Sequence, residues 1–77
     1  MQTTTVASSL LLAITYDASN QLLDLEFRDR KIYRYRGVPV AVHKAFLDST
    51  SKGEFFNRAI RGAFPHELLW KPGGFLS

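Results

Sequence analysis

The sequence predicts an α+β fold, in which a three-stranded antiparallel β-meander is followed by two short α-helices packed on one face of the sheet. Two observations support this prediction: apolar and polar residues alternate in the first half of the chain, and apolar residues recur at helical spacing in the second half. The chain has 77 residues, of which 45% are hydrophobic and none is cysteine, so packing around a single core must stabilise it. We expect one domain over residues 8–68, a flexible leader over residues 1–7 and a tail over residues 69–77.

Three segments have the character of strands. Residues 10–16 are rich in aliphatic and β-branched side chains and are followed by a polar, turn-forming segment at residues 17–20. In residues 23–27, apolar side chains alternate with charged ones, which indicates a strand with one buried face. Residues 31–36 alternate in the same way and follow a short link. The second and third segments should therefore form an antiparallel hairpin.

The length of the hairpin loop decides which residues face the core. A two-residue loop would turn Arg34 and Arg36 toward the core, where their charges would lack partners. A three-residue loop over residues 28–30 avoids this cost and gives the pairs Leu25–Tyr33, Leu23–Tyr35 and Asp24–Arg34. Such a loop favours glycine in the left-handed conformation at its third position. Because Arg30 stands there, we expect strain of about 1 kcal/mol.

Two helices are predicted after Gly37. The first covers residues 39–48, with Pro39 in its first turn and His43 and Lys44 outside the apolar stripe, which consists of Val38, Ala41, Val42, Ala45 and Phe46. The second begins at Ser51, whose spacing to Glu54 matches a capping box, and ends by Gly62. Its apolar face is formed by Phe55, Phe56, Ala59, Ile60 and Ala63, and its polar stripe by Glu54, Asn57, Arg58 and Arg61.

Charge is unevenly distributed along the chain. Residues 1–27 carry no lysine or arginine, whereas residues 28–36 carry five basic side chains against Asp29 alone. The formal net charge is +3, which modestly favours polyanionic partners. Any basic surface should therefore lie in the centre of the chain or toward its C-terminus.

Two groups of residues are candidates for nucleic-acid binding. One is the hairpin, where aromatic and basic side chains interleave as on surfaces that bind single strands; its members are Arg30, Lys31, Tyr33, Arg34, Tyr35 and Arg36. The other is the start and polar stripe of the second helix, with Lys52, Gly53, Asn57, Arg58 and Arg61. For both groups the sequence favours structural roles over binding: the tyrosines can pack in the core, Asp24 can pair with Arg34, and Ser51 and Glu54 can cap each other.

The sequence gives little support for catalysis. His43 and His66, the only histidines, lie in different segments, and no metal-binding spacing or carboxylate cluster accompanies them. We expect both to be surface histidines and expect neither a cofactor nor a metal. The longest apolar run has five residues against roughly 20 for a transmembrane helix, and the start lacks the features of a signal peptide. A cytoplasmic, non-enzymatic protein is expected.

The order and spacing of several short elements resemble the KTSC domain family over about residues 8–68. These elements are Ser8-Ser9, Ile14, Tyr16-Asp17, Leu23-x-Leu25-x-Phe27, Tyr33-Arg34-Tyr35, Val38-Pro39, Ser51-Lys52-Gly53, Phe56-Asn57, Ile60-Arg61 and Pro65. Thr15 and Arg30 stand where the family often has glycine. The family is named for domains at the C-terminus of some lysyl-tRNA synthetases and also includes small stand-alone bacterial and phage proteins. The resemblance implies a non-enzymatic domain for which RNA binding has been suggested.

Two functional hypotheses follow from the sequence. The first is a small domain that binds RNA or another single-stranded nucleic acid through the two basic groups. The alternative is a protein-interaction module that uses an exposed sheet edge or the aromatic tail from Trp70 to Phe75. The sequence predicts no oligomeric state.

Overall fold

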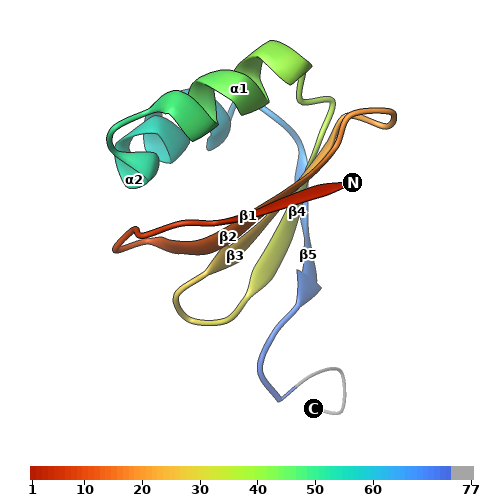
Figure 1. Cartoon of the computed structure of the whole chain (residues 1–77). Coiled ribbons are helices and arrows are strands. Elements are labelled where there is room, and N and C mark those ends of the chain that lie inside the picture. The colour runs from red at the N-terminus through yellow and green to blue at the C-terminus, as the bar shows by residue number, and fades with distance from the viewer. Residues whose placement is uncertain (74–77) are drawn as a thin grey trace.

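A five-stranded antiparallel sheet carries all of the helical structure on one of its faces (Figure 1). The structure is a computed structural model, and it describes residues 1–73. The strands follow one another across the sheet in chain order and are β1 (Gln2–Thr5), β2 (Leu11–Asp17), β3 (Leu22–Phe27), β4 (Ile32–Arg36) and β5 (His66–Trp70). The helices are α1 (Val40–Asp48), α2 (Lys52–Phe55) and the π-helix η1 (Phe56–Ile60).

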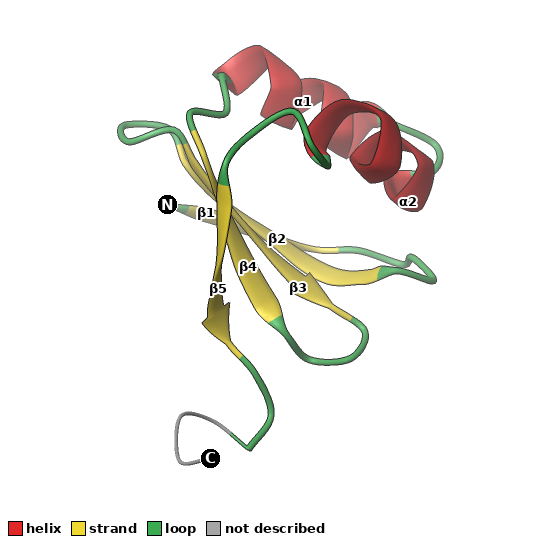
Figure 2. Cartoon of the chain, turned by 180° about the vertical axis from the view of Figure 1, so that it is seen from behind, coloured by secondary structure: helices red, strands yellow, loops and turns green. Residues whose placement is uncertain are grey.

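The predicted α+β class and the meander over β2, β3 and β4 are confirmed, but the predicted number of three strands is wrong. The segment expected to be a flexible leader contains β1, which pairs with β2. The segment spanning the expected domain end and tail contains β5, which pairs with β4 (Figure 2). Both added strands lie at the edges of the sheet, and their β-branched or apolar side chains are largely exposed. Their sequences therefore lack the regular alternation of apolar and polar residues that predicts a strand.

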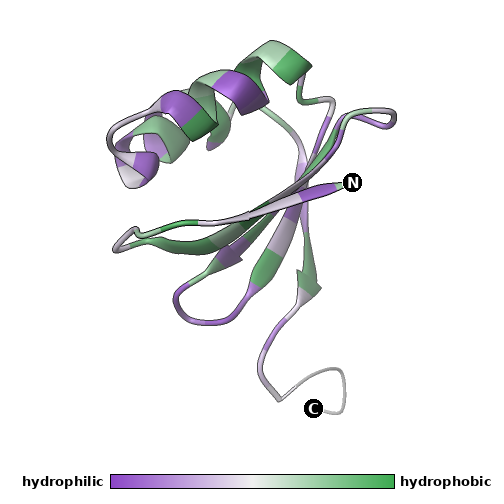
Figure 3. Cartoon of the chain, viewed as in Figure 1, coloured by the Kyte–Doolittle hydropathy of each residue, from purple (hydrophilic) through white to green (hydrophobic). Residues whose placement is uncertain are grey.

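The β3–β4 hairpin has the predicted register. Leu25 pairs with Tyr33, Leu23 with Tyr35 and Asp24 with Arg34. Arg30 adopts φ = 73°, so the left-handed residue expected in a three-residue loop is present. Figure 3 shows this loop as a hydrophilic segment between two strands that carry hydrophobic residues. Because of this register, Tyr33 and Tyr35 both lie on the helix-covered face of the sheet.

The core lies between the sheet and the helices. Its fully buried side chains come from β2, β3, the β4–α1 link, α1 and η1, and they are Leu11, Ile14, Leu23, Leu25, Val38, Phe46 and Ile60. A buried aliphatic side chain of this kind contributes roughly 1.5–3 kcal/mol relative to exposure. The sheet face opposite the helices has no covering layer among the described residues (Figures 1 and 2).

The predicted surface position of His43 is wrong. Its side chain is only 6% exposed, and its ring stacks on that of Tyr16 with centroids 4.2 Å apart. The inward stripe of α1 is shifted by one residue from the predicted one, so that Ala41 and Ala45 are exposed. The alanines are too small to fill the space above the sheet, and the larger side chains of α1 occupy it instead.

The second helical segment begins as predicted but does not continue as a regular α-helix. The backbone N–H of Glu54 donates to Ser51 Oγ at 3.2 Å, which confirms Ser51 as the N-cap. The helix then widens into η1, where the N–H of Arg61 reaches back five residues to the carbonyl of Phe56 at 2.8 Å. No helix in the described part of the chain is long and apolar enough to cross a membrane.

Candidate nucleic-acid interface

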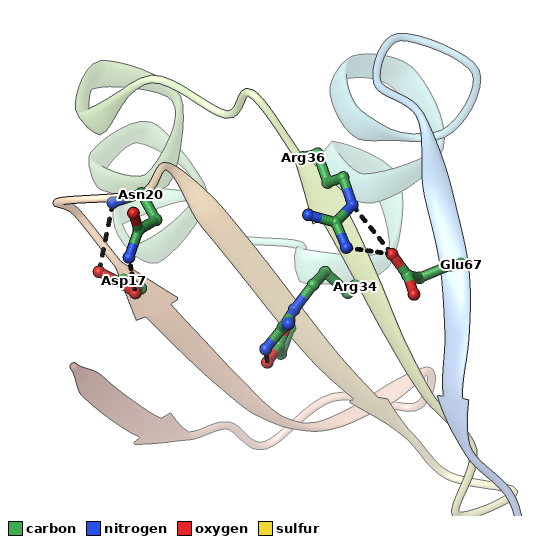
Figure 4. Close-up of polar contacts among 6 residues, drawn as sticks. Asp17, Asn20, Arg34, Arg36 and Glu67 are labelled. Atoms are coloured by element: carbon green, nitrogen blue, oxygen red, sulfur yellow. Dashed lines mark hydrogen bonds and ion pairs between the residues drawn. The ribbon is translucent and has the colours of Figure 1, made fainter.

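Three of the predicted hairpin arginines are paired with carboxylates. On the uncovered sheet face, Arg34 makes two hydrogen bonds to Asp24, at 2.9 and 3.0 Å, with side chains that are 25% and 16% exposed. The Asp24 carboxylate raises the pKa of Arg34, mainly through its hydrogen bond with the guanidinium. Arg36 pairs with Glu67 across β4 and β5 (Figure 4). These contacts neutralise charge that would otherwise attract phosphate.

The third paired arginine lies next to the hairpin loop. Arg30 Nε donates to Glu26 Oε2 at 2.9 Å. Arg30, Arg34 and Arg36 are all predicted to bind nucleic acid, and in the structure each has a carboxylate partner. Such pairs are weak when exposed, but they reduce the positive potential of the uncovered face.

A shallow hollow of about 250 Å³ opens on the helix side of the sheet, which we call the aromatic hollow. It is bounded by the β3–β4 hairpin, the start of β5 and the end of η1. The lining residues are Phe27, Asp29, Lys31, Tyr33, Tyr35, Phe56, Arg61, Gly62 and His66. The fold therefore brings four predicted site residues together from distant parts of the sequence: Lys31, Tyr33, Tyr35 and Arg61.

Packed rings form the floor of the aromatic hollow. The Tyr35 ring is 4% exposed and lies between Phe56, met edge to face at 5.8 Å, and His66, stacked at 5.4 Å. The Tyr33 ring meets Phe27 edge to face at 5.8 Å and the tilted ring of His66 at the same distance. These contacts fix the ring positions before any ligand arrives.

The phenol of Tyr35 has an environment that keeps it protonated. Burial raises its pKa above the ordinary 10.0, the neighbouring Tyr33 adds to the rise, and the Arg61 guanidinium partly opposes it. Tyr16 offers a contrast, because its hydroxyl donates to the carbonyl of Val38 at 2.6 Å. Among residues 1–73, no protein group accepts from or donates to the Tyr35 hydroxyl. A protonated phenol is thus available beside a guanidinium.

The cations around the aromatic hollow are weakly engaged. Arg61 contacts Asn57 Oδ1 at 3.4 Å, and the Lys31 ammonium lies 3.9 Å from the Asp29 carboxylate. Arg58 precedes Arg61 in the helical segment and does not line the hollow, and its guanidinium lies 5.5 Å from the centre of the Phe55 ring. Lys31, Arg58 and Arg61 therefore keep charge that a phosphate could engage.

The remaining predicted residues lie apart from the aromatic hollow. Lys52 and Gly53 line a second recess of about 550 Å³ beside the β1–β2 connection. The Lys52 ammonium donates to the carbonyl of Ser49, so it holds the α1–α2 link. Of the second candidate group, Arg61 therefore joins the hairpin residues at the aromatic hollow, whereas Lys52 and Gly53 lie at a separate recess.

His66 was not recognised from the sequence as a site residue. Its ring contacts both tyrosines only because β5 folds back beside β4 and pairs His66 with Tyr35. The sequence signal that could have located it is the short apolar run Leu68, Leu69 and Trp70 after Pro65, which indicates an added edge strand. Within the described residues, no three acidic or histidine side chains are grouped so that they could hold a metal ion.

The sheet and its single layer of helices define a small α+β domain. Residues 7–64 match the KTSC domain family, and the chain belongs to this family. A KTSC domain protein of Yersinia pestis has the same fold, with a TM-score of 0.85 and 40% identity over 88% of this chain and 96% of that one. An uncharacterized protein of Stutzerimonas stutzeri is 36% identical over 92% of this chain and 97% of its own length.

The same sequence pattern occurs within much larger proteins. A lysine–tRNA ligase of a Nostoc species is 38% identical over 61 residues, which is 79% of this chain. Those residues make up 11% of the ligase, so the similarity concerns one small region of that enzyme.

Proposed function

We propose that this domain binds RNA through the aromatic hollow and the cations that line it, Lys31 and Arg61, with a contribution from Arg58 on the same helical segment as Arg61. The observation that carries the proposal is the separation of charge between the two sides of the molecule. Arginines near the uncovered sheet face have carboxylate partners, whereas the cations beside the aromatic hollow are weakly engaged. Cations next to accessible aromatic rings are the combination that single-stranded nucleic acids bind.

Phosphate neutralisation supplies the expected binding energy. Each phosphate contact to a single strand releases condensed counterions and contributes about 0.7 to the slope of log K against log salt. Asp29 lies in the same hollow and partly offsets Lys31. We therefore expect weak binding that depends on salt.

RNA is preferred to DNA in this proposal because of the relatives. Three lysine–tRNA ligases contain a region 33–38% identical to this chain, and their names state that tRNA is their substrate. By analogy with those enzymes, we propose RNA as the polyanion that the weakly engaged cations of this chain bind.

The proposal is tested by fluorescence anisotropy with a short single-stranded RNA at several salt concentrations. The double variant Lys31→Ala, Arg61→Ala should weaken binding and lower the salt slope by about 1.4, that is, by two phosphate contacts. The matched control Lys44→Ala, Lys71→Ala removes the same charge at two exposed positions that do not line the aromatic hollow, and it should have a smaller effect. Equal losses from both variants would indicate non-specific attraction to net charge and would contradict the proposed site.

One observation supports protein interaction as a second candidate function. β5 is an edge strand, and its side chains Leu68, Leu69 and Trp70 are 43%, 41% and 43% exposed. Edge strands with apolar side chains recruit further strands. Sedimentation at two concentrations, for the natural chain and for Trp70→Ser, tests self-association; an unchanged monomer in both would remove it. Phe75, the other aromatic residue in the predicted tail, lies outside the described residues.

A further inference from the structure

The aromatic hollow is shallow and is bordered by three chain segments that are distant from one another in the sequence. The hairpin contributes Lys31, β5 contributes His66, and the end of η1 contributes Arg61 and Gly62. Its volume of about 250 Å³ is below the roughly 300–1,000 Å³ typical of pockets for drug-sized ligands. A recess of this size suits one small planar group.

The rings in the aromatic hollow have different exposure, and this assigns them different roles. Tyr35 is almost fully buried, so it can offer its hydroxyl but little ring surface. Tyr33 is half-buried and His66 is exposed, and their rings lie 5.8 Å apart at a tilt of 56°. Ring surface for stacking is therefore available on His66 and Tyr33, and Tyr35 lines the same hollow.

The cations lie on the rim of this aromatic surface. Arg61 lines the same recess as Tyr35. Lys31 is on the hairpin side of the same recess. A phosphate attached to a group stacked in the hollow would meet these cations without displacing a strong ion pair, because Arg61 has only a long hydrogen bond to Asn57.

We propose that the aromatic hollow takes one unpaired nucleotide of an RNA strand, with its base against His66 and Tyr33 and its phosphate beside Lys31 and Arg61. This inference rests on the proposed RNA binding and adds a preference: single strands over duplexes. In a duplex the bases are stacked and paired, and the deep, narrow major groove of A-form RNA excludes side chains. An unpaired base can turn out of its strand and enter the hollow.

The Tyr35 hydroxyl gives the site a polar contact with the base. A phenol both donates and accepts hydrogen bonds, and here it has no protein partner among the described residues. A base edge or a 2′-hydroxyl would satisfy it. Tyr35→Phe keeps the buried ring and removes only this contact, so it should bind RNA several-fold more weakly while the fold is preserved.

The test compares a short, unstructured RNA alone with the same RNA annealed to its complement, by fluorescence anisotropy at one salt concentration. The single strand should bind at least ten times more tightly. His66→Ala should weaken binding of the single strand by roughly 5- to 150-fold, the range for loss of one stacked base, and should leave the weak duplex binding unchanged. Because His66 is exposed, this variant is expected to fold.

Trp70→Ala is the matched control, because it removes an exposed aromatic side chain of the same strand that does not line the aromatic hollow. It should leave the preference for single strands intact. Equal binding of strand and duplex, or a loss from Trp70→Ala but not from His66→Ala, would overturn this inference and leave RNA binding in place. Absence of binding to either RNA at low salt would overturn the proposed function as well.

Discussion

His43 Nε2 is a buried side-chain nitrogen for which no residue in the described part of the chain provides a hydrogen bond. Its ring lies in the core against Tyr16, and burial lowers the pKa of the imidazole below 6.5. The neutral form is therefore the one that the fold accommodates. An unpartnered polar atom of this kind costs stability that the surrounding packing has to offset.

The stability of the domain should therefore depend on mildly acidic pH through His43. The unfolded chain takes up the proton near pH 6.5, before the folded chain does, so stability is complete above that pH and falls as the pH decreases toward the lowered pKa of the folded state. The hydrogen bond with Asn20 is the main cause that lowers the pKa of the Asp17 carboxyl below its ordinary 3.8. Asp17 therefore affects the stability of the domain only at lower pH.

His43→Phe tests this dependence, because it keeps an aromatic ring against Tyr16 and removes the titrating group. Urea unfolding of both proteins between neutral pH and pH 5 should show a smaller loss of stability for the variant. Parallel pH profiles for the two proteins would show that His43 does not control acid sensitivity.

Among the elements, the β3–β4 hairpin carries strain at one known position. Arg30 has φ = 73°, which costs a residue with a side chain about 1 kcal/mol relative to glycine. Arg30→Gly should therefore stabilise the domain by about 0.5–1 kcal/mol, measured by chemical denaturation. Arg30→Ala is the control, since it loses the same exposed contact to Glu26 but keeps the strain. Equal stability of the two variants would contradict the assignment of strain.

The hairpin was predictable because burial and charge agree on one register. The register that buries Leu23 and Leu25 opposite the two tyrosines also pairs Asp24 with Arg34. A two-residue loop would instead turn Arg34 and Arg36 toward the core and separate Arg34 from Asp24. The edge strands were not predictable in this way. β1 consists of one glutamine and three threonines, and every residue of β5 is exposed, so neither segment shows the two-residue period on which strand prediction depends.

The α1 helix shows a different limit of sequence analysis. Alanine and histidine are ambiguous in a hydrophobic stripe, and rotation by one residue replaced Ala41 and Ala45 with His43 and Leu47 on the covered side. These limits, the unrecognised edge strands and the ambiguous helix face, also affect prediction of the candidate site. Its tyrosines and Arg61 were found from residue chemistry, whereas His66 depended on a strand that pairs only in the folded molecule.

At the scale of the whole molecule, the two sides of the sheet have different chemistry. The uncovered side carries the bidentate pair between Arg34 and Asp24, both largely shielded from water. The helix-covered side ends in the aromatic hollow, where Arg61 has no carboxylate partner among the described residues. Stability and RNA binding should therefore respond to different arginines, although each substitution changes the net charge equally.

Replacing each arginine with alanine separates these two properties. Arg34→Ala leaves Asp24 part-buried without its partner and should lower the free energy of unfolding by about 1–2 kcal/mol, a value reduced for the remaining exposure of the pair. It should change RNA affinity only as much as the exposed control Lys44→Ala does. Arg61→Ala should show the opposite pattern, with near-natural stability and weaker RNA binding. Urea denaturation of these three variants measures their stability, and fluorescence anisotropy measures their RNA affinity. If Arg34→Ala lowered RNA affinity as much as Arg61→Ala does, the proposed division between the two sides of the sheet would be contradicted.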